Sequence, residues 1–191
     1  MNKTLFSPNT MIWEYFKGLR RLVSNINIHS QEEQKQEIAL SIFLAITVVE
    51  AFLNIYFRIA VEEEPYKTHR KNLIDNLNDR KSLDYKIKNW PKDILGKNLN
   101  FDTGIGKDFM DLKDKRNKLM HFKSSYESIA IEDINILGLA DTSVYDSLTV
   151  NDAIFALDTA EKILEEIFRC RGIEEEKIPG MIHLWTGKIP G

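Results

Sequence analysis

One apolar stretch constrains the fold more than any other feature of the chain, and it runs from Ile38 to Val61. The polar residues inside it recur at steps of three and four: Thr47, Glu50, Asn54 and Arg58. This spacing puts them on one stripe of a helix whose other sides are apolar. We therefore predict a long central helix that is surrounded by other helices, with one polar stripe that meets a partner or lines a cleft.

The same stretch is long enough to cross a membrane. Glu50 lies at its middle, where an acidic side chain costs about 2.5 to 3.5 kcal/mol on insertion scales, and Asn54 and Arg58 add to this cost. We therefore expect a buried core helix and no membrane span.

Helix start and stop signals occur on both sides of this stretch. Ser7 and Pro8 resemble an N-cap and a first helical residue, and Ser30 and Glu33 form a capping box for the central helix. Apolar periodicity predicts further helices over 73–77, from Ser82 toward Trp90 where Pro91 interrupts, over about 106–123, and from Thr149 to Gly172. The expected fold class is all-α, a bundle of about five to seven helices around the central one.

Two segments lack a sustained helical period. Residues 96–104 are rich in Gly, Asn and Asp and predict a loop. In 124–148, the isoleucines at 129, 131, 134 and 136 are compatible with a short strand or with an ordered loop. The predicted domain organisation is a helical domain over 1–172, followed by an extended C-terminal tail over 173–191 that packs on the domain or on a partner.

The charge of the chain is unevenly distributed. The net charge is −3, yet residues 65–123 hold 15 Lys and Arg against 8 Asp and Glu. Such a basic zone can attract phosphates, although a solvated helical surface has the same composition. The single cysteine, Cys170, excludes an intramolecular disulfide, and we expect a cytoplasmic protein.

The basic zone ends in one compact group of polar residues, Arg116-Asn117-Lys-Leu-Met-His121. Arginine suits phosphate because its guanidinium donates paired, charge-assisted hydrogen bonds. Histidine suits proton transfer because its ordinary pKa lies near neutrality. On an ideal helix Arg116 and His121 are about 140° apart, so another element or a second copy of the chain must complete a site.

This pattern of Arg, a polar residue, three further residues and His resembles the hallmark of the HEPN superfamily. The long hydrophobic helix upstream, with Glu50 inside it, resembles the family as well. The resemblance implies a helical bundle that forms a homodimer, with metal-independent endoribonuclease activity in a cleft between the subunits. It also implies a toxin or phage-defence role, often beside a nucleotidyltransferase antitoxin. Family members regulated by nucleotidylation carry a tyrosine two residues after the histidine, where this chain has Lys123.

The resemblance assigns roles to particular residues. His121 acts as general base or acid, Arg116 stabilises the phosphate, and Asn117 and Glu50 orient them. The expected RNA-binding lysines are Lys113, Lys115, Lys118 and Lys123.

Structural alternatives exist for the same residues. Arg116 can instead be a buried arginine paired with Glu50, and His121 a surface histidine near a helix end. The corresponding functional alternative is a non-catalytic module that binds RNA or a protein.

The sequence predicts neither a metal site nor a cofactor. His29, His69 and His183 lie in separate segments, without the spacing of zinc ligands. No glycine-rich phosphate loop is present, and Cys170 has no base placed beside it.

Overall fold

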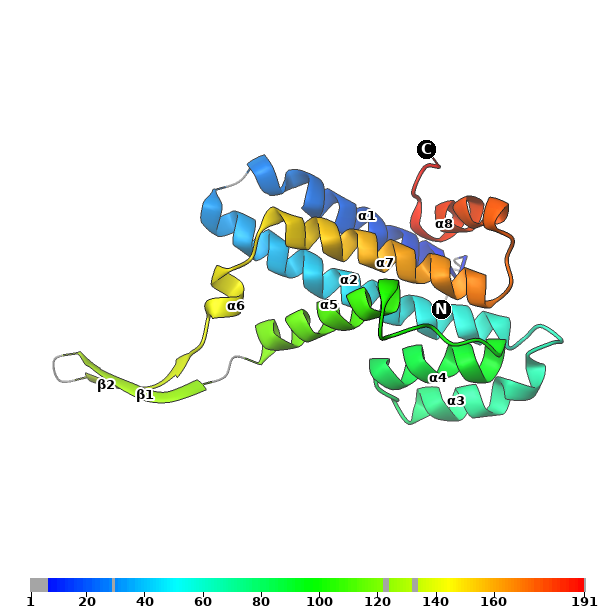
Figure 1. Cartoon of the computed structure of the whole chain (residues 1–191), viewed down its shortest axis with the longest axis horizontal. Coiled ribbons are helices and arrows are strands. Elements are labelled where there is room, and N and C mark those ends of the chain that lie inside the picture. The colour runs from blue at the N-terminus through cyan, green and yellow to red at the C-terminus, as the bar shows by residue number, and fades with distance from the viewer. Residues whose placement is uncertain (1–6, 29, 122–123, 132–133, 191) are drawn as a thin grey trace, which may run out of the picture.

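The computed structural model describes residues 7–28, 30–121, 124–131 and 134–190, and within 124–140 it describes the backbone alone. Over these residues the chain is an all-α bundle of eight helices with one two-stranded hairpin (Figure 1). The structure has more helices than the expected five to seven because two short helices, α6 (Ser143–Asp146) and α8 (Ile178–Thr186), lie in segments without a long apolar period.

The central helix is α2 (Gln31–Ala60), and the capping box predicted for its start is confirmed. The Ser30 backbone N–H donates to Glu33 Oε2 at 3.0 Å, and the Ser30 hydroxyl accepts from the Glu33 N–H. Helices α1 (Thr10–Asn25) and α7 (Val150–Cys170) pack along α2 on one side of the molecule (Figure 1). The predicted helix after Thr149 is also confirmed, with a second capping box between Thr149 and Asp152.

Three further helices pack against α2: α3 (Arg70–Asn78), α4 (Leu83–Leu95) and α5 (Gly104–Met120). The predicted interruption at Pro91 is wrong, because α4 continues through it to Leu95. Proline removes one backbone hydrogen bond. Burial of Ile87, Trp90 and Ile94 on the same face of α4 holds the helix together across that position.

An aromatic cluster joins α2 to the C-terminal part of the chain. The rings of Phe52 and Tyr56 stack at 4.9 Å, and both meet Phe168 of α7 and Trp185 of α8 edge to face. Such pairs contribute about 0.5 to 1.5 kcal/mol each beyond the area that they bury. The C-terminal residues are therefore part of the core.

The predicted extended tail is wrong for residues 178–186, which form α8 against α1 and α7. Ile178, Ile182 and Trp185 are buried at steps of four and three, which is the spacing of one helix face. Pro179 lies in the first turn of α8, where its missing N–H costs nothing, and Gly187 ends the helix with a φ of +73°.

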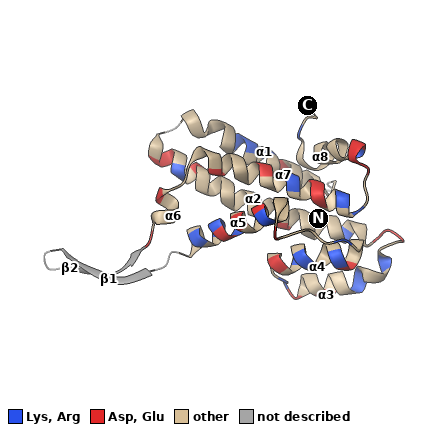
Figure 2. Cartoon of the chain, viewed as in Figure 1, with Lys and Arg blue, Asp and Glu red and all other residues tan. Residues whose placement is uncertain are grey.

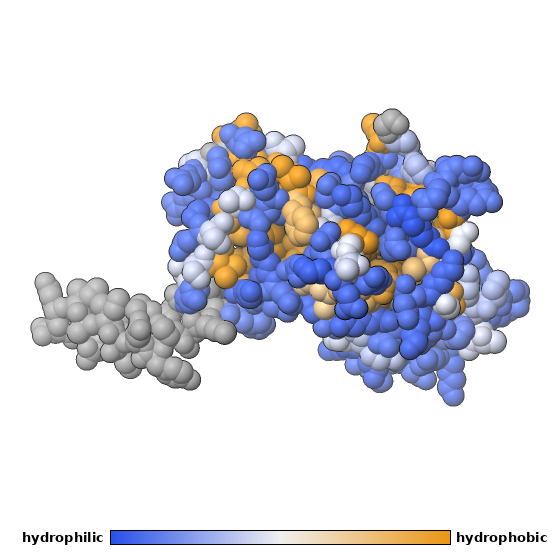
Figure 3. All heavy atoms as spheres, in the orientation of Figure 1, coloured by the Kyte–Doolittle hydropathy of each residue, from blue (hydrophilic) through white to orange (hydrophobic). Residues whose placement is uncertain are grey.

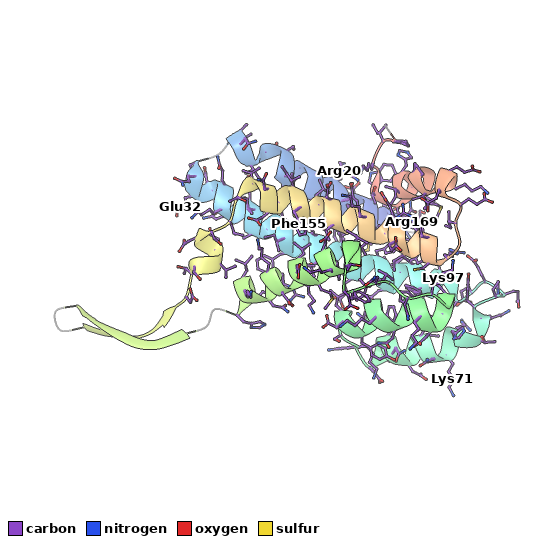
Figure 4. All side chains as sticks on the ribbon, in the orientation of Figure 1. Arg20, Glu32, Lys71, Lys97, Phe155 and Arg169 are labelled. Carbon is purple, nitrogen blue, oxygen red and sulfur yellow. The ribbon has the colours of Figure 1, made fainter. Side chains whose placement is uncertain are left out.

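A buried carboxylate fixes this end of the chain. Glu161 of α7 is 3% exposed and accepts hydrogen bonds from Arg20 of α1 and from Lys188, at 3.1 and 2.6 Å. Arg20 also donates to the Thr186 carbonyl oxygen at 2.7 Å. Arg20 of α1 and Arg169 of α7 are labelled near α8 in Figure 4. This network ties α1, α7 and the segment after α8 together.

Within residues 124–148, for which the sequence was compatible with a strand or a loop, the chain forms an antiparallel hairpin of β1 (Ser124–Ile131) and β2 (Ile134–Ala140). Ser124 pairs with Ala140 at its base and Ile131 with Ile134 at its tip. The hairpin leaves the bundle between α5 and α6 (Figure 1). Its base therefore returns the chain to the end of α5.

Helix α2 is the one described helix that is long and apolar enough to cross a membrane. Of its most apolar 18-residue window, 56% is buried within the protein, against the other helices. This packing is that of a core helix, which passes the same test of length and composition.

Candidate functional site

Helix α5 carries the predicted motif in its last turn and a half. The helix ends at Met120, and His121 follows as the C-cap, its backbone N–H donating to the Asn117 carbonyl oxygen at 2.9 Å. The His121 side chain is exposed, whereas Arg116 and Asn117 are half-buried. Figure 2 shows blue Lys and Arg residues alternating with red acidic residues along α5.

Arg116 has an unusual environment for a half-buried guanidinium. Its Nη1 lies 3.2 Å from the sulfur of Met120, one turn ahead. Among the described residues, neither a carboxylate within ion-pair distance nor a hydrogen bond to His121 accompanies it. The guanidinium therefore keeps donors available for an anion.

Glu50 does not pair with Arg116, so the pair proposed from the sequence is wrong. Glu50 Oε1 accepts from Nζ of Lys86, on α4, at 2.6 Å. The Lys86 side chain is 7% exposed, and its ammonium also lies 5.8 Å from the centre of the Trp90 ring. Glu50 thus compensates a buried lysine, since a buried charge needs a partner of opposite sign.

The four lysines expected to bind RNA have different environments. Lys113 is 8% exposed, with Nζ 2.7 Å from both carboxylate oxygens of Asp84, so it is not a surface cation. Lys115 is half-buried and paired with Asp152 at the start of α7. Lys118 is exposed, and Lys123 lies outside the described residues.

A pocket of about 210 Å³ lies at the end of α5. It is lined by Lys118 and His121 from α5, by Asp141, and by Val144 of α6. Asp141 was not identified from the sequence, because it lies twenty residues from His121 in a segment without a helical period. Its place in the pocket depends on the register of the hairpin, which pairs Ser124 with Ala140 and is not visible as a pattern in the sequence.

The polar stripe of α2 both meets a partner and lines a pocket: Glu50 pairs with Lys86, and Asn54 and Arg58 line a pocket between the start of α1 and the end of α3. Thr47 and Arg58 are exposed, and Glu50 and Asn54 are half-buried. Leu40, on the same side, is 53% exposed. Along this side of the central helix, Leu40, Thr47 and Arg58 are therefore exposed, while the residues between them are partly covered.

At the start of α7, Lys115 changes the pKa of Asp152. Burial opposes the charged form of Asp152, but hydrogen bonds from the Lys115 ammonium and from the Thr149 N–H and hydroxyl outweigh it. The pKa of Asp152 is therefore below its ordinary value. Lys115, the residue before Arg116, therefore pairs with the carboxylate that caps α7.

Within the part of the chain that the structure describes, no group of three or more His, Cys, Asp or Glu side chains is arranged to hold a metal ion. Comparison of the chain with protein-family models, with curated proteins and with solved structures finds no match.

Proposed function

We propose that the protein is a HEPN-type, metal-independent endoribonuclease that works as a homodimer. One observation carries this proposal: a half-buried guanidinium, which has no carboxylate partner among the residues that the structure describes, lies five residues before an exposed imidazole at the end of the same helix. A half-buried arginine without a compensating charge costs free energy of desolvation. Binding of a phosphate would recover that free energy through charge-assisted hydrogen bonds.

The reaction that suits this pair is transfer of an RNA phosphodiester to its own ribose. His121 takes the proton of the 2′-hydroxyl, and the 2′-oxygen attacks phosphorus as the bond to the 5′-oxygen breaks. The leaving oxygen takes a proton from an imidazolium or from water, which yields a 2′,3′-cyclic phosphate and a 5′-hydroxyl. Arg116 stabilises the charge that develops on the phosphate oxygens.

A second copy of the chain supplies what one subunit lacks. Arg116 and His121 point about 140° apart around α5, so one copy does not direct both at the same phosphate. The exposed side of α2 offers a surface for pairing, because Leu40, Thr47 and Arg58 are exposed and recur after two and three helical turns on one side of the helix. Such spacing is typical of seams between two helices.

The pairing is tested by the mass of the protein in solution. We expect a dimer by analytical ultracentrifugation, and a monomer for Thr47→Arg, which puts like charges opposite each other in a two-fold seam. Glu32→Arg, a substitution on the exposed first turn of the same helix, is the control and leaves the dimer intact. A monomeric parent protein would contradict the shared cleft.

Cleavage is tested with purified protein and single-stranded RNA in excess EDTA. We expect product with a 5′-hydroxyl end, a loss of about 100-fold or more for Arg116→Ala and His121→Ala, and no loss for the control His69→Ala, on η2 (Lys67–His69). Single variants that cut as fast as the parent would exclude these catalytic roles.

The alternative is a binding module of the same fold. The exposed apolar side chains Ile154 and Phe155 on α7 favour a protein partner for this module, and Phe155 is labelled on α7 in Figure 4. The face of the molecule drawn in Figure 3 mixes apolar and hydrophilic residues. Salt-sensitive RNA binding without cleavage would support this module over the nuclease. A toxin or phage-defence role, a nucleotidyltransferase antitoxin and a cytoplasmic location belong to the nuclease proposal.

A further inference from the structure

The pocket at the end of α5 brings together three groups that the sequence separates. Lys118 and His121 come from α5, and Asp141 follows β2 directly. The pairing of Ser124 with Ala140 explains the meeting, because the hairpin closes three residues after His121 and one residue before Asp141. The hairpin therefore brings Asp141 and His121, which are twenty residues apart in the sequence, to the lining of one pocket.

The wall that carries Asp141 is itself anchored. The Asp141 carboxylate accepts from the Ser143 N–H at 2.9 Å, which fixes it at the start of α6. Lys35 of α2 donates to the Asp146 carbonyl oxygen at 2.7 Å, and Val144 packs on the hydrophobic core. The pocket is thus built from two elements that are both attached to the central helix.

We infer that this pocket binds the scissile phosphate of RNA, and that Asp141 is a positioning residue for His121. The inference rests on the proposed ribonuclease function and adds two things to it: a phosphate subsite within one subunit and a carboxylate partner for the imidazole. Lys118 supplies the cation on the side of α5 that Arg116 does not reach. Asp141 accepts a hydrogen bond from the imidazole and so fixes the ring and its tautomer for proton transfer.

These roles predict opposite effects for two substitutions in the pocket. Lys118→Ala removes the attraction for phosphate, so it raises KM more than it lowers kcat. Asp141→Asn keeps an acceptor for the Ser143 N–H but removes the charge that orients the imidazole, so kcat falls by at least about tenfold. Its KM stays unchanged or falls, because a negative charge near the phosphate is gone.

The binding test does not depend on catalysis. Inorganic phosphate is titrated into the full chain while the His121 ring resonances are followed by NMR, with uridine 3′-monophosphate as a second probe. We expect saturable shifts that are lost in Lys118→Ala and retained or tightened in Asp141→Asn. Lys107→Ala, at the opposite end of α5, and Asp158→Asn, on α7, are the matched controls and bind as the parent does.

The outcomes separate this inference from the proposed function. Phosphate-dependent shifts in a protein that cuts no RNA would overturn the ribonuclease proposal and the role of Asp141 in it, and leave the pocket as an anion site. A protein that cuts RNA without any shift of His121, or an Asp141→Asn variant with the kcat of the parent, would overturn the inference alone. Unchanged thermal unfolding of both variants shows that the pocket remains folded.

Discussion

Lys86 Nζ lies 2.6 Å from Glu50 Oε1, and this ion pair connects α4 to the polar stripe of the central helix. The lysine is almost fully buried while the carboxylate is 37% exposed, so the pair compensates chiefly the lysine. Removing the carboxylate leaves an ammonium without a partner in an apolar environment, which is costlier than losing the attraction itself.

We therefore predict that Glu50→Gln lowers the free energy of unfolding by about 1 to 3 kcal/mol, as measured by urea denaturation. Glu64→Gln is the matched control, because Glu64 forms an exposed pair with Lys67, and its effect stays below about 0.5 kcal/mol. The double variant Glu50→Gln with Lys86→Met recovers part of the loss. Equal effects of Glu50→Gln and Glu64→Gln would contradict the compensating role.

Substitution of Arg116 is predicted to lower activity strongly while changing stability little. Since its guanidinium lacks a carboxylate partner among the described residues, Arg116→Met changes the free energy of unfolding by less than about 1 kcal/mol in either direction. RNA cleavage by the same variant falls by about 100-fold or more. A large loss of stability in urea denaturation would show that Arg116 is a structural residue.

Asp152 gives a prediction that depends on pH. Its pKa is lowered from the ordinary 3.8, so its charge stabilises the folded state above that value, and the contribution disappears as the pH falls through the lower folded pKa. We expect Asp152→Asn to cost on the order of 1 kcal/mol near neutral pH, since the carboxylate is partly solvated. Urea denaturation at a series of pH values should show this difference shrinking below pH 3.8.

The control for Asp152 is Asp158→Asn on the exposed side of the same helix, with a difference below about 0.5 kcal/mol at every pH. A cost for Asp152→Asn that stays constant into the acid range would mean that the amide fails as a cap for a reason other than charge.

Two glycines around α8 are predicted to respond with opposite signs. A Cβ at Gly187 would lie 2.7 Å from Trp13, and its φ of +73° disfavours any side chain. Gly187→Ala should therefore destabilise the protein by about 1 to 3 kcal/mol and change the Trp13 fluorescence. Gly180 lies within α8 with open space around it, so Gly180→Ala should stabilise by about 0.5 to 1 kcal/mol.

Thermal and urea unfolding of both alanine variants measure these effects. If Gly187→Ala were as stable as the parent, the contact between Trp13 and the end of α8 would not contribute to docking of this helix.

The elements that could be predicted from sequence are those whose signals are local. Ser30 with Glu33 and Thr149 with Asp152 are caps read within one turn, and the apolar periods that follow them are long. The tail around Ile178 was predicted as extended because its prolines and glycines outweighed an apolar spacing of only three residues. At Pro91 the burial of α4, a tertiary effect, overrides the local signal.

For the candidate site, too, only the local part of the arrangement could be predicted from the sequence. Arg116, Asn117 and His121 lie in one segment, so their pattern is visible in the sequence. Their partners are not, because Glu50 can reach either Arg116 or Lys86 depending on how α4 and α5 pack on α2. Asp141 reaches the pocket only through strand pairing between distant residues, and no single-residue pattern records such a register.

The first pair of the hairpin, Ser124 with Ala140, forms its base, and the remaining pairs extend from this base to the tip. Two residues that line the pocket, His121 and Asp141, flank that first pair in the sequence, whereas the pair of Ile131 with Ile134 is at the tip of the hairpin. The part of the hairpin beyond this first pair is therefore separate from the pocket lining. A change in the length or composition of the hairpin beyond its first pair should therefore leave Lys118, His121 and Asp141 in their places around the pocket.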